Sequence, residues 1–508
     1  MSNRTDSPGQ GSLRGGALTA GSALIISGVA AGVGVVIARE FGRTDETDGL
    51  LTAYGVFIVI AIAAQAIRVA VLPQLAHAWD DRRLAGEIAG YALALAVFAV
   101  PLVLVAELAA EPLAGLLTGG ESEIARDTAA DALRWIVPAA AAYLFAGLAA
   151  SGLAARDDYG TAALGYAAGS LAGLTLILLR VEPDGIIAVA WGMTLNATIA
   201  LAVPVAALAV HAARARMPSR AMRPAGPPLR SRLGAFAVGA ALPLAIQLLY
   251  LVCLPFAARL GTGAATSFVY AYLASASLVA VTAASLGLAT SVPLARRGVH
   301  AEAVAHHIVA SSWLALVLVG AAAGVFALAG GDLVEAVLGD SYRADVGSEV
   351  GRLVVVLSLW MIASVGIAVA FPLAFVVGRT RGLPLIAAAA LALQVPLAWA
   401  GARVLELDGL TLALVLSTVL VLAALLVDLG TFAGAARGLL AAGLAVTGVT
   451  LAAFLPPALV FGSVVSAVIG LVLYVVLFAV LRPRGLTASW HYLRALGGAE
   501  SAGSARRA

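Results

Sequence analysis

The sequence predicts an all-α integral membrane protein of about 14 transmembrane helices, built as two six-helix lobes and a C-terminal helix pair. Hydrophobic residues make up 62% of the chain and charged residues only 12%, whereas about a quarter of the residues of a soluble protein are charged. Apolar runs of about 20 residues, long enough to cross a bilayer, recur along the whole chain. The loops between them alternate between arginine-rich and acidic, which is typical of a multi-pass membrane protein.

The predicted elements follow in order along the chain. Candidate spans lie near residues 17–38, 50–76, 86–109, 130–154, 161–180, 185–211, 233–258, 265–294, 303–329, 348–377, 382–403, 408–433, 438–460 and 462–481. The predicted domains are a cytoplasmic N-terminal tail (1–16), an N-lobe of helices 1–6 (17–211), a basic linker (212–232), a C-lobe of helices 7–12 (233–433), helices 13–14 (434–481) and a cytoplasmic C-terminal tail (482–508).

The stretch from His211 to Arg232 sets the topology. It holds six arginines and four prolines but no acidic residue, so it predicts a cytoplasmic loop rather than a regular element. With the N-terminus inside, the inner segments hold 21 arginines and the outer segments seven, which places both termini in the cytoplasm. Since topology explains the linker charge, we expect single Arg→Gln changes in the linker to be tolerated. The absence of lysine suggests a bacterial source, hence the bacterial cytoplasmic membrane.

An internal repeat is centred on the linker. Residues 111–120 (EPLAGLLTGG) match 331–340 (GDLVEAVLGD), and residues 72–79 match 292–299, both at a shift of 220. Tyr54 and Tyr272 lie 218 residues apart. Because six is an even number, helices 1–6 and 7–12 become two copies in the same orientation. Parallel repeats are typical of secondary transporters, in which the substrate site lies between the copies.

Several function classes are disfavoured by the residues. Cys253 is the sole cysteine, so a disulfide framework or a cysteine-based metal cluster cannot form. The sequence lacks HExxH, CxxC and GxxxxGK[ST] motifs, which argues against an enzyme and predicts no cofactor and no metal. The basic residues are confined to loops between apolar runs, and we therefore expect no nucleic-acid partner.

Polar residues inside or beside the spans are the candidate substrate-binding residues. Arg68 lies in an apolar span, where a charge is costly, with Gln65 one helical turn earlier. Arg68 either meets an anionic head group in a polar cavity or snorkels to the membrane interface. Arg39 and Asp48 flank the first outer turn and are either a ligand contact at a cavity mouth or ordinary interfacial charges. Gln247 and Tyr272 either line a polar cavity or form interhelical hydrogen bonds.

Three stretches carry a resemblance to a known family. ARxFG (38–42) is followed by TDGLLTAY (47–54) and by LPQLA (72–76), and further likeness extends over residues 133–159 and 267–296. These stretches resemble the MviN/MurJ lipid II flippase family of the multidrug/oligosaccharidyl-lipid/polysaccharide (MOP) superfamily. The resemblance implies alternating access between two lobes that carries an undecaprenyl-pyrophosphate-linked cell-wall precursor across the membrane. It also implies proteins of cell-wall synthesis as partners.

The resemblance carries over to single residues only in part. Arg39 matches a basic residue at the end of the family's helix 1, and Asp48 matches its acid at the start of helix 2. Basic residues of the family are replaced near Val33, near residues 60–61 and around Tyr272, and the acids of its sodium site are missing from helices 7 and 11. The predicted cargo is therefore a lipid II-like or another lipid-linked glycan.

Two alternatives remain. One is a polysaccharide-unit flippase or multidrug antiporter of the same superfamily, although the spans lack a convincing central carboxylate to carry protons. The other is a membrane scaffold without transport activity. In each case the basic tail after Arg482 is predicted to lie on anionic lipids.

Overall fold

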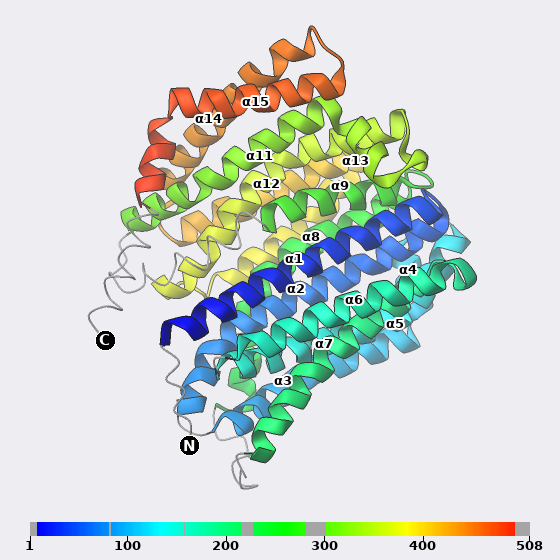
Figure 1. The fold of residues 1–508 in the computed structure, drawn as a ribbon, viewed down its shortest axis with the longest axis vertical. Helices are drawn as coiled ribbons and strands as arrows, with labels where there is room; N and C mark the ends of the chain where they lie inside the picture. Colours follow the sequence, from blue (N-terminus) through cyan, green and yellow to red (C-terminus); the bar gives the residue numbers. More distant parts are fainter. Residues whose placement is uncertain are drawn as a thin grey trace. The chain divides into compact units, whose positions relative to one another are not determined.

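The computed structural model describes residues 8–80, 83–120, 122–156, 158–214, 227–280 and 301–492. Within its helices, the side chains of residues 8–20, 23, 65–70, 73, 76, 80 and 301 are not described. All regular elements in these ranges are helices, which confirms the predicted all-α class (Figure 1). The contacts divide the chain into two compact units, unit 1 ending at Gly263 and unit 2 beginning at Ala264. The predicted lobes are instead divided at the basic linker; that division follows the repeat and stays a prediction.

Unit 1 is built around one central helix. Its helices are α1 (Pro8–Phe41), α2 (Asp45–Asp80), α3 (Leu84–Leu108), α4 (Ala110–Leu117), α5 (Glu123–Ala154), α6 (Tyr159–Asp184), α7 (Ile187–Arg214) and α8 (Leu229–Ala258). Helix α5 packs against α2, α3, α4 and α7 and is 78% buried along its apolar window. Alanines and glycines on α5 and on the helices around it allow the backbones to approach closely. At Gly49 of α2, for example, a Cβ would lie 3.1 Å from the carbonyl carbon of Ala125.

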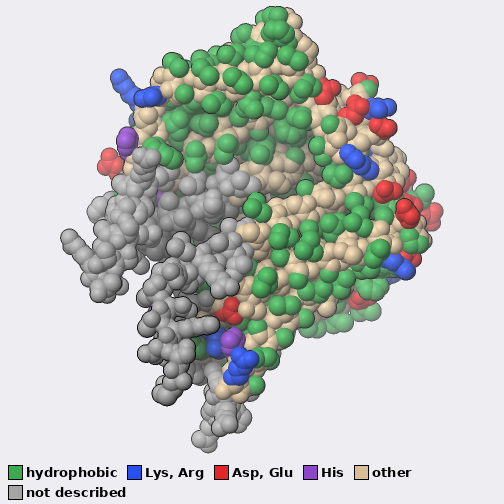
Figure 2. Space-filling view, in the orientation of Figure 1, with side chains coloured by type: hydrophobic (Ala, Val, Ile, Leu, Met, Phe, Trp, Pro, Cys, Tyr) green, Lys and Arg blue, Asp and Glu red, His purple; other side chains and the backbone are tan. Residues whose placement is uncertain are grey.

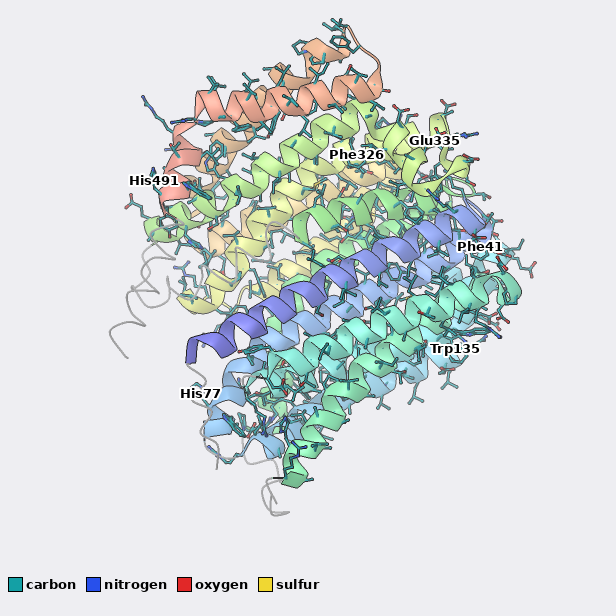
Figure 3. All side chains as sticks on the ribbon, viewed as in Figure 1. Phe41, His77, Trp135, Phe326, Glu335 and His491 are labelled. Carbon is teal, nitrogen blue, oxygen red and sulfur yellow. The ribbon has the colours of Figure 1, made fainter. Side chains whose placement is uncertain are left out.

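The helices of unit 1 run up and down, so their ends form two sets. At one end α2, α5 and α7 finish while α3, α6 and α8 begin; the basic linker joins two of these helices, and we call it the linker end. At the opposite end lie the turns after α1, α3, α6 and α8, and we call it the pocket end. Phe41 marks the pocket end of α1 and His77 the linker end of α2 (Figure 3).

Unit 2 has the equivalent arrangement around α12. Its elements are α9 (Ala264–Val279), α11 (Ala301–Leu338), the 3-10 turn η3 (Asp340–Tyr342), α12 (Asp345–Val377), α13 (Leu383–Asp428), α14 (Phe432–Ala458) and α15 (Ser463–Leu481). Helix α12 packs on α9, α11 and α13. The C-terminal pair α14–α15 packs on α11, where the Tyr474 hydroxyl donates to the carbonyl oxygen of Val317 at 2.7 Å.

Twelve of the described helices are long and apolar enough to cross a membrane. The two further predicted spans fall in α13 and α9. Helix α13 has 46 residues with non-helical backbone at Leu405 and Glu406. A straight helix of 46 residues would be roughly 69 Å long, more than twice the thickness of the bilayer core. The backbones of Gly401 and Gly409 touch across this break, so α13 is a helical hairpin that holds the predicted spans 382–403 and 408–433. Helix α9 is the first part of the predicted span 265–294, and the rest lies outside the described residues.

The backbone agrees with the predicted internal repeat at one pair of matching positions. Helix α3 is followed by a break at Ala109 (φ −127°, ψ 29°) and by the short helix α4. Helix α11 has its break at Ala329 (φ −119°, ψ 15°), after which residues 330–338 continue as helix. The two breaks are 220 residues apart and have nearly the same conformation, as the shift between residues 111–120 and 331–340 predicts. The match from residues 72–79 to 292–299 ends in a segment outside the described residues.

The surface has the pattern of a membrane protein. On the face in Figure 2, hydrophobic side chains cover the middle of the helices, and charged side chains gather near their ends. Many large exposed side chains are leucine, valine or phenylalanine, including Leu93, Phe98 and Val205. In water such a surface would aggregate, whereas in a bilayer it faces lipid. The chain is a multi-pass membrane protein.

Candidate functional site

The candidate site is built on the turn between α1 and α2. Gly42 adopts a left-handed conformation (φ 60°) and its N–H returns to the carbonyl oxygen of Ala38 at 3.1 Å, which ends α1. The Thr44 hydroxyl then accepts from the N–H of Thr47 at 3.3 Å and caps α2. The first turn of α2 carries Asp45, Glu46 and Asp48, where negative charge is stabilised by the helix dipole.

Asp48 is buried and holds the loop that follows α8. Asp48 is only 4% exposed, and its Oδ2 accepts from the N–H of Gly263 at 2.6 Å. Arg43 Nε donates to the carbonyl oxygen of the same Gly263 at 3.1 Å. Gly263 has φ 81°, and a Cβ there would lie 2.6 Å from Arg43 Nε, so this position requires glycine. We call this arrangement of Arg43, Asp48 and Gly263 the Gly263 latch.

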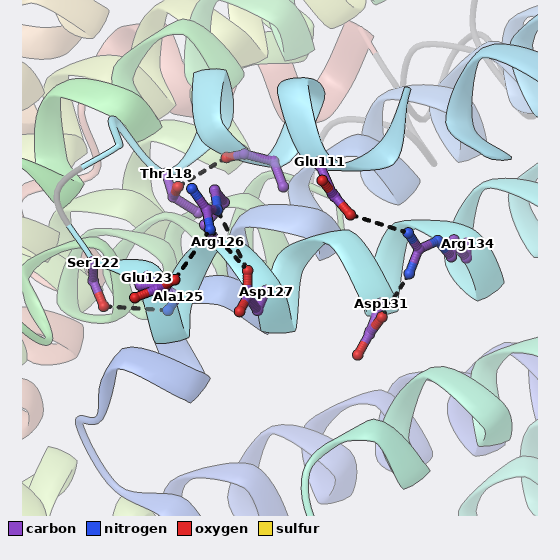
Figure 4. A network of polar contacts seen from close by, with 10 residues as sticks. Glu111, Thr118, Ser122, Glu123, Ala125, Arg126, Asp127, Asp131 and Arg134 are labelled. Carbon is purple, nitrogen blue, oxygen red and sulfur yellow. Dashed lines mark hydrogen bonds and ion pairs between the residues drawn. The ribbon is translucent and has the colours of Figure 1, made fainter. Parts of the chain in front are cut away.

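Asp45 joins three segments at the pocket end. Its Oδ2 accepts from the Ser122 hydroxyl at 2.9 Å and its Oδ1 from the Thr262 hydroxyl at 2.8 Å. Ser122 also caps α5, because its hydroxyl accepts from the N–H of Ala125 at 3.2 Å (Figure 4). The start of α2, the start of α5 and the loop after α8 are therefore held together by one carboxylate.

A cavity of about 320 Å³ lies among these groups. It is lined by Asp45, Asp48, Thr52, Thr118, Ser122, Ala125, Ala258, Arg259, Gly261 and Thr262. The Thr52 hydroxyl is fully buried and lacks a hydrogen-bond partner among the described residues. Leaving such a group unpaired costs about 1–3 kcal/mol, so the cavity is suited to a ligand or solvent oxygen. We call this cavity the Asp48 pocket.

The pocket combines opposite charges with hydroxyl groups. Asp45 and Asp48 supply carboxylate acceptors, and Arg259 supplies a guanidinium whose Nε donates to the carbonyl oxygen of Gly119 at 3.2 Å. The Thr118 hydroxyl donates to the carbonyl oxygen of Ala114 at 2.8 Å. Such a set can hydrogen-bond hydroxyl groups and anionic oxygens of a polar ligand.

A second polar group flanks the pocket on α4 and α5. Arg134 NH1 donates to Asp131 at 2.8 Å, and its NH2 lies 3.9 Å from Glu111 of α4 (Figure 4). Asp131 and Arg134 are three residues apart on α5, a spacing that brings two side chains to the same face of a helix. Since these side chains are exposed, the pairs add little stability. In unit 2, Arg352 Nε donates to Asp408 of α13 at 3.2 Å.

The six predicted site residues are distributed unevenly. Asp48 lines the pocket, and Arg39 is exposed at the end of α1. Gln247 is half-buried on α8. Tyr272 is buried in unit 2 with its ring centroid 5.1 Å from that of Trp360. Gln65 and Arg68 lie on α2 among the residues whose side chains are not described.

Sequence reasoning missed most of the pocket. The missed polar residues are Asp45, Thr52, Thr118, Ser122, Arg259 and Thr262. Of these, Ser122 carried a local signal, since serine is a preferred helix cap and the acid Glu123 follows it in the first turn. Asp45 and Thr52 lie within about a helical turn of Asp48, whereas Ser122 and Thr262, the partners of Asp45, come from 77 and 217 residues away in the chain.

At the linker end, the surroundings of Arg232 argue against the expectation that every single Arg→Gln change in the linker is tolerated. Its NH2 lies 2.7 Å from Glu87 Oε2 of α3, and the two side chains are 2% and 8% exposed. Its Nε donates to the carbonyl oxygen of Pro227 at 3.0 Å, and its Cζ lies 4.4 Å from the centroid of the Tyr91 ring. Arg232 is therefore a buried ion-pair partner on α8 and not a solvated linker residue.

The fold, but not the sequence, matches known proteins. No protein-family model matches the chain, and no curated protein matches it in sequence. Among solved structures, the inward closed conformation of the lipid II flippase MurJ matches with a TM-score of 0.70 and 13% identity, over 91% of this chain and 98% of that chain.

Two MATE structures also match. An inward-facing MATE family transporter of the MOP superfamily has a TM-score of 0.61 at 15% identity, over 82% of this chain and 94% of that one. A MATE structure in the bent conformation has a TM-score of 0.53 at 16% identity, over 83% and 94%. Identities this low are evidence of the fold alone. The chain has the fold of MurJ and of the MATE transporters of the MOP superfamily, as the resemblance predicted.

Proposed function

We propose that this chain is a transporter that moves a lipid-linked, phosphate-bearing glycan across the bacterial cytoplasmic membrane by alternating access. The observation that carries the proposal is the fold shared with MurJ over 91% of this chain and 98% of that chain. The parallel repeat supports it, because two similar bundles in one orientation are typical of secondary transporters. A lipid II-like undecaprenyl-pyrophosphate glycan is the cargo that we infer from the resemblance.

The Asp48 pocket supports the proposal by its chemistry. Its carboxylates, hydroxyls and guanidinium suit a cargo that carries sugar hydroxyls and phosphate oxygens. We infer that the polar head of the cargo contacts Asp48 and Thr52 at the pocket end. The Gly263 latch would hold the loop after α8 in the conformation described here, and alternating access would require that loop to be released and rebound.

The second candidate is a multidrug antiporter. It is favoured by the MATE likeness, with a TM-score of 0.61, and by the buried carboxylate of Asp48. Against it, Asp48 lies in the first turn of α2 and accepts from a backbone N–H. A carboxylate held in this way, at the start of its helix, is poorly placed to carry a proton through the membrane centre.

The test is rescue of a bacterium depleted of its lipid II flippase. The wild-type chain should restore growth, and Asp48→Asn should lower rescue at equal membrane abundance. Glu46→Gln is the matched control, because Glu46 is an exposed acid in the same helical turn that does not line the pocket. Arg39→Ala and Arg68→Ala test the two predicted cationic contacts.

A parallel assay separates the candidates. Cells lacking their main drug exporters are transformed with the same plasmids, and resistance to cationic drugs is measured. Resistance without rescue would favour the antiporter. Failure of the wild-type chain in both assays, despite good membrane expression, would favour the transport-inactive scaffold and refute the proposal.

A further inference from the structure

A groove on unit 1 lies apart from the Asp48 pocket. Among the described residues, α3 and α7 both pack on α5 but make at most slight contact with each other. The resulting cavity of about 300 Å³ is lined by Leu84, Ala85, Ile88, Ala92, Phe145, Leu148, Ala149, Arg156, Leu201, Val205, Leu208, Ala209 and Ala212. Phe145, Leu148 and Ala149 of α5 lie between the two walls. A Cβ on Gly152 would lie 2.7 Å from Ile88 Cδ1 of α3 and 3.5 Å from Leu208 Cδ1 of α7.

The groove faces the lipid side of the bundle. The apolar windows of α7 and α3 are only 17% and 28% buried, against 78% for α5. Val205, on the α7 wall, is 47% exposed. In a membrane this surface contacts acyl chains rather than water. The occupant of the groove must therefore have a hydrocarbon chain.

Arg156 is the one charged residue that lines the groove. It follows the end of α5 and is half-buried, and its Cζ lies 4.5 Å from the centroid of the Trp79 ring. That ring fixes the guanidinium by a cation–π contact. Arg156 has no ion pair among the described residues. A guanidinium in this position suits an anionic group at the end of the hydrocarbon.

Two further arginines lie at the linker end near the groove. Arg83 and Arg214 are exposed directly beside the lining residues Leu84 and Ala212. The nearby carboxylate of Asp158 accepts hydrogen bonds from Thr161. Its Oδ1 accepts from the N–H of Thr161 at 3.1 Å, which caps α6, and its Oδ2 accepts from the Thr161 hydroxyl at 2.9 Å.

The same Asp158 Oδ2 lies 3.7 Å from His211 Nε2. Trp79 and Tyr159 are 38% and 45% exposed at this level, and such aromatics are enriched at membrane interfaces. The groove therefore ends at the depth where lipid phosphates lie.

We propose that this groove is a binding site for an anionic phospholipid of the predicted cytoplasmic leaflet. One acyl chain lies between α3 and α7, and Arg156 donates hydrogen bonds to the phosphate. Apolar lining alone would accept any lipid, so preference for anionic lipid comes from Arg156 and its basic neighbours. The site is separate from the predicted interfacial tail after Arg482, and it does not depend on the proposed transport function.

The probes are phosphatidylglycerol and phosphatidylcholine with identical acyl chains. The full-length protein is purified in detergent, and the retained lipids are counted by native mass spectrometry over a lipid titration. Wild type should retain phosphatidylglycerol in preference. Arg156→Gln should weaken that binding about fivefold, the factor expected for one basic residue near an anionic surface, and leave phosphatidylcholine binding unchanged. Arg156→Lys should keep most of the preference.

Two further variants separate a site from a general effect. Arg180→Gln is the matched control, because Arg180 is an exposed arginine at the pocket end that pairs with Asp184 at 2.6 Å; it should leave phosphatidylglycerol binding unchanged. Ala209→Trp places a large side chain at the exposed α7 wall and should reduce retention of both lipids. Equal losses in Arg156→Gln and Arg180→Gln would mean a net-charge effect and would overturn the proposal.

A competitor addresses the other source of the same chemistry. Farnesyl pyrophosphate also joins a hydrocarbon chain to anionic oxygens. If it displaces phosphatidylglycerol at equal concentration in wild type but not in Arg156→Gln, the groove belongs to a cargo route and the phospholipid assignment is wrong. Retention of phosphatidylglycerol under these conditions supports the assignment.

Discussion

Replacing Arg232 by glutamine should destabilise unit 1 far more than the same change at any exposed linker arginine. Arg232 and Glu87 form an ion pair at 2.7 Å with side chains only 2% and 8% exposed. Glutamine would leave the Glu87 carboxylate buried without its charge partner, which costs about 3–5 kcal/mol. It would also remove the donor to Pro227 and the contact with the Tyr91 ring.

The comparison variants follow from the same geometry. Arg230→Gln changes an exposed arginine two residues earlier, and surface charges contribute only about 0–1 kcal/mol. The double variant Arg232→Met with Glu87→Leu removes both charges, so it should recover much of the loss, because apolar replacement of a whole buried pair is often neutral. The coupling energy of the double-mutant cycle isolates the pair.

The assay is thermal unfolding of the purified protein in detergent, followed by loss of monomer on size-exclusion chromatography. The expected order of apparent Tm is wild type close to Arg230→Gln, then the double variant, then Arg232→Gln lowest. Equal Tm values for Arg232→Gln and Arg230→Gln would refute the reasoning, because they would show that Arg232 is solvated in the membrane-embedded protein.

The remaining predictions concern glycines and the latch. Gly263→Ala should lower Tm, because φ is 81° and a Cβ would lie 2.6 Å from Arg43 Nε; strain of this kind costs about 1–3 kcal/mol. Gly409→Ala should destabilise the α13 hairpin, since its Cβ would overlap the Gly401 backbone, whereas Gly443→Ala, with open space around it, should not. Asp48→Asn should weaken the charge-assisted bond to the Gly263 N–H, and faster protease cleavage in the loop after α8 would report its release; unchanged cleavage would contradict the latch.

The sequence predicted the spans because hydrophobicity is a local property. Helix ends fell within a few residues of the predicted boundaries for most spans. The two arms of the α13 hairpin, which meet at the break at Leu405 and Glu406, correspond to two predicted spans. One clear difference is α5, which begins at Glu123 rather than near residue 130. Its first two turns are polar, and the Ser122 cap rather than hydrophobicity decides where it starts.

The candidate site was predicted less well for a physical reason. Asp48 was singled out by its place beside an outer turn, but its partner Gly263 is 215 residues away. The partners of Asp45 are 77 and 217 residues away. Threonines such as Thr52 have no sequence pattern that separates a pocket hydroxyl from one that bonds its own helix.

The sequence by itself determined that this is a multi-pass helical membrane protein with a parallel repeat, and it predicted which loops lie inside. Chain length, apolar content and loop arginines are enough for this. Each spanning helix must hydrogen-bond its own backbone groups, and charged residues are mostly kept in the loops. Only the tertiary structure decided that Arg232 is paired with Glu87, that Arg156 ends an apolar groove, and that Asp45 and Asp48 share a pocket. Those outcomes depend on which helices pack together, and hydrophobic spans of nearly equal composition do not specify their neighbours locally.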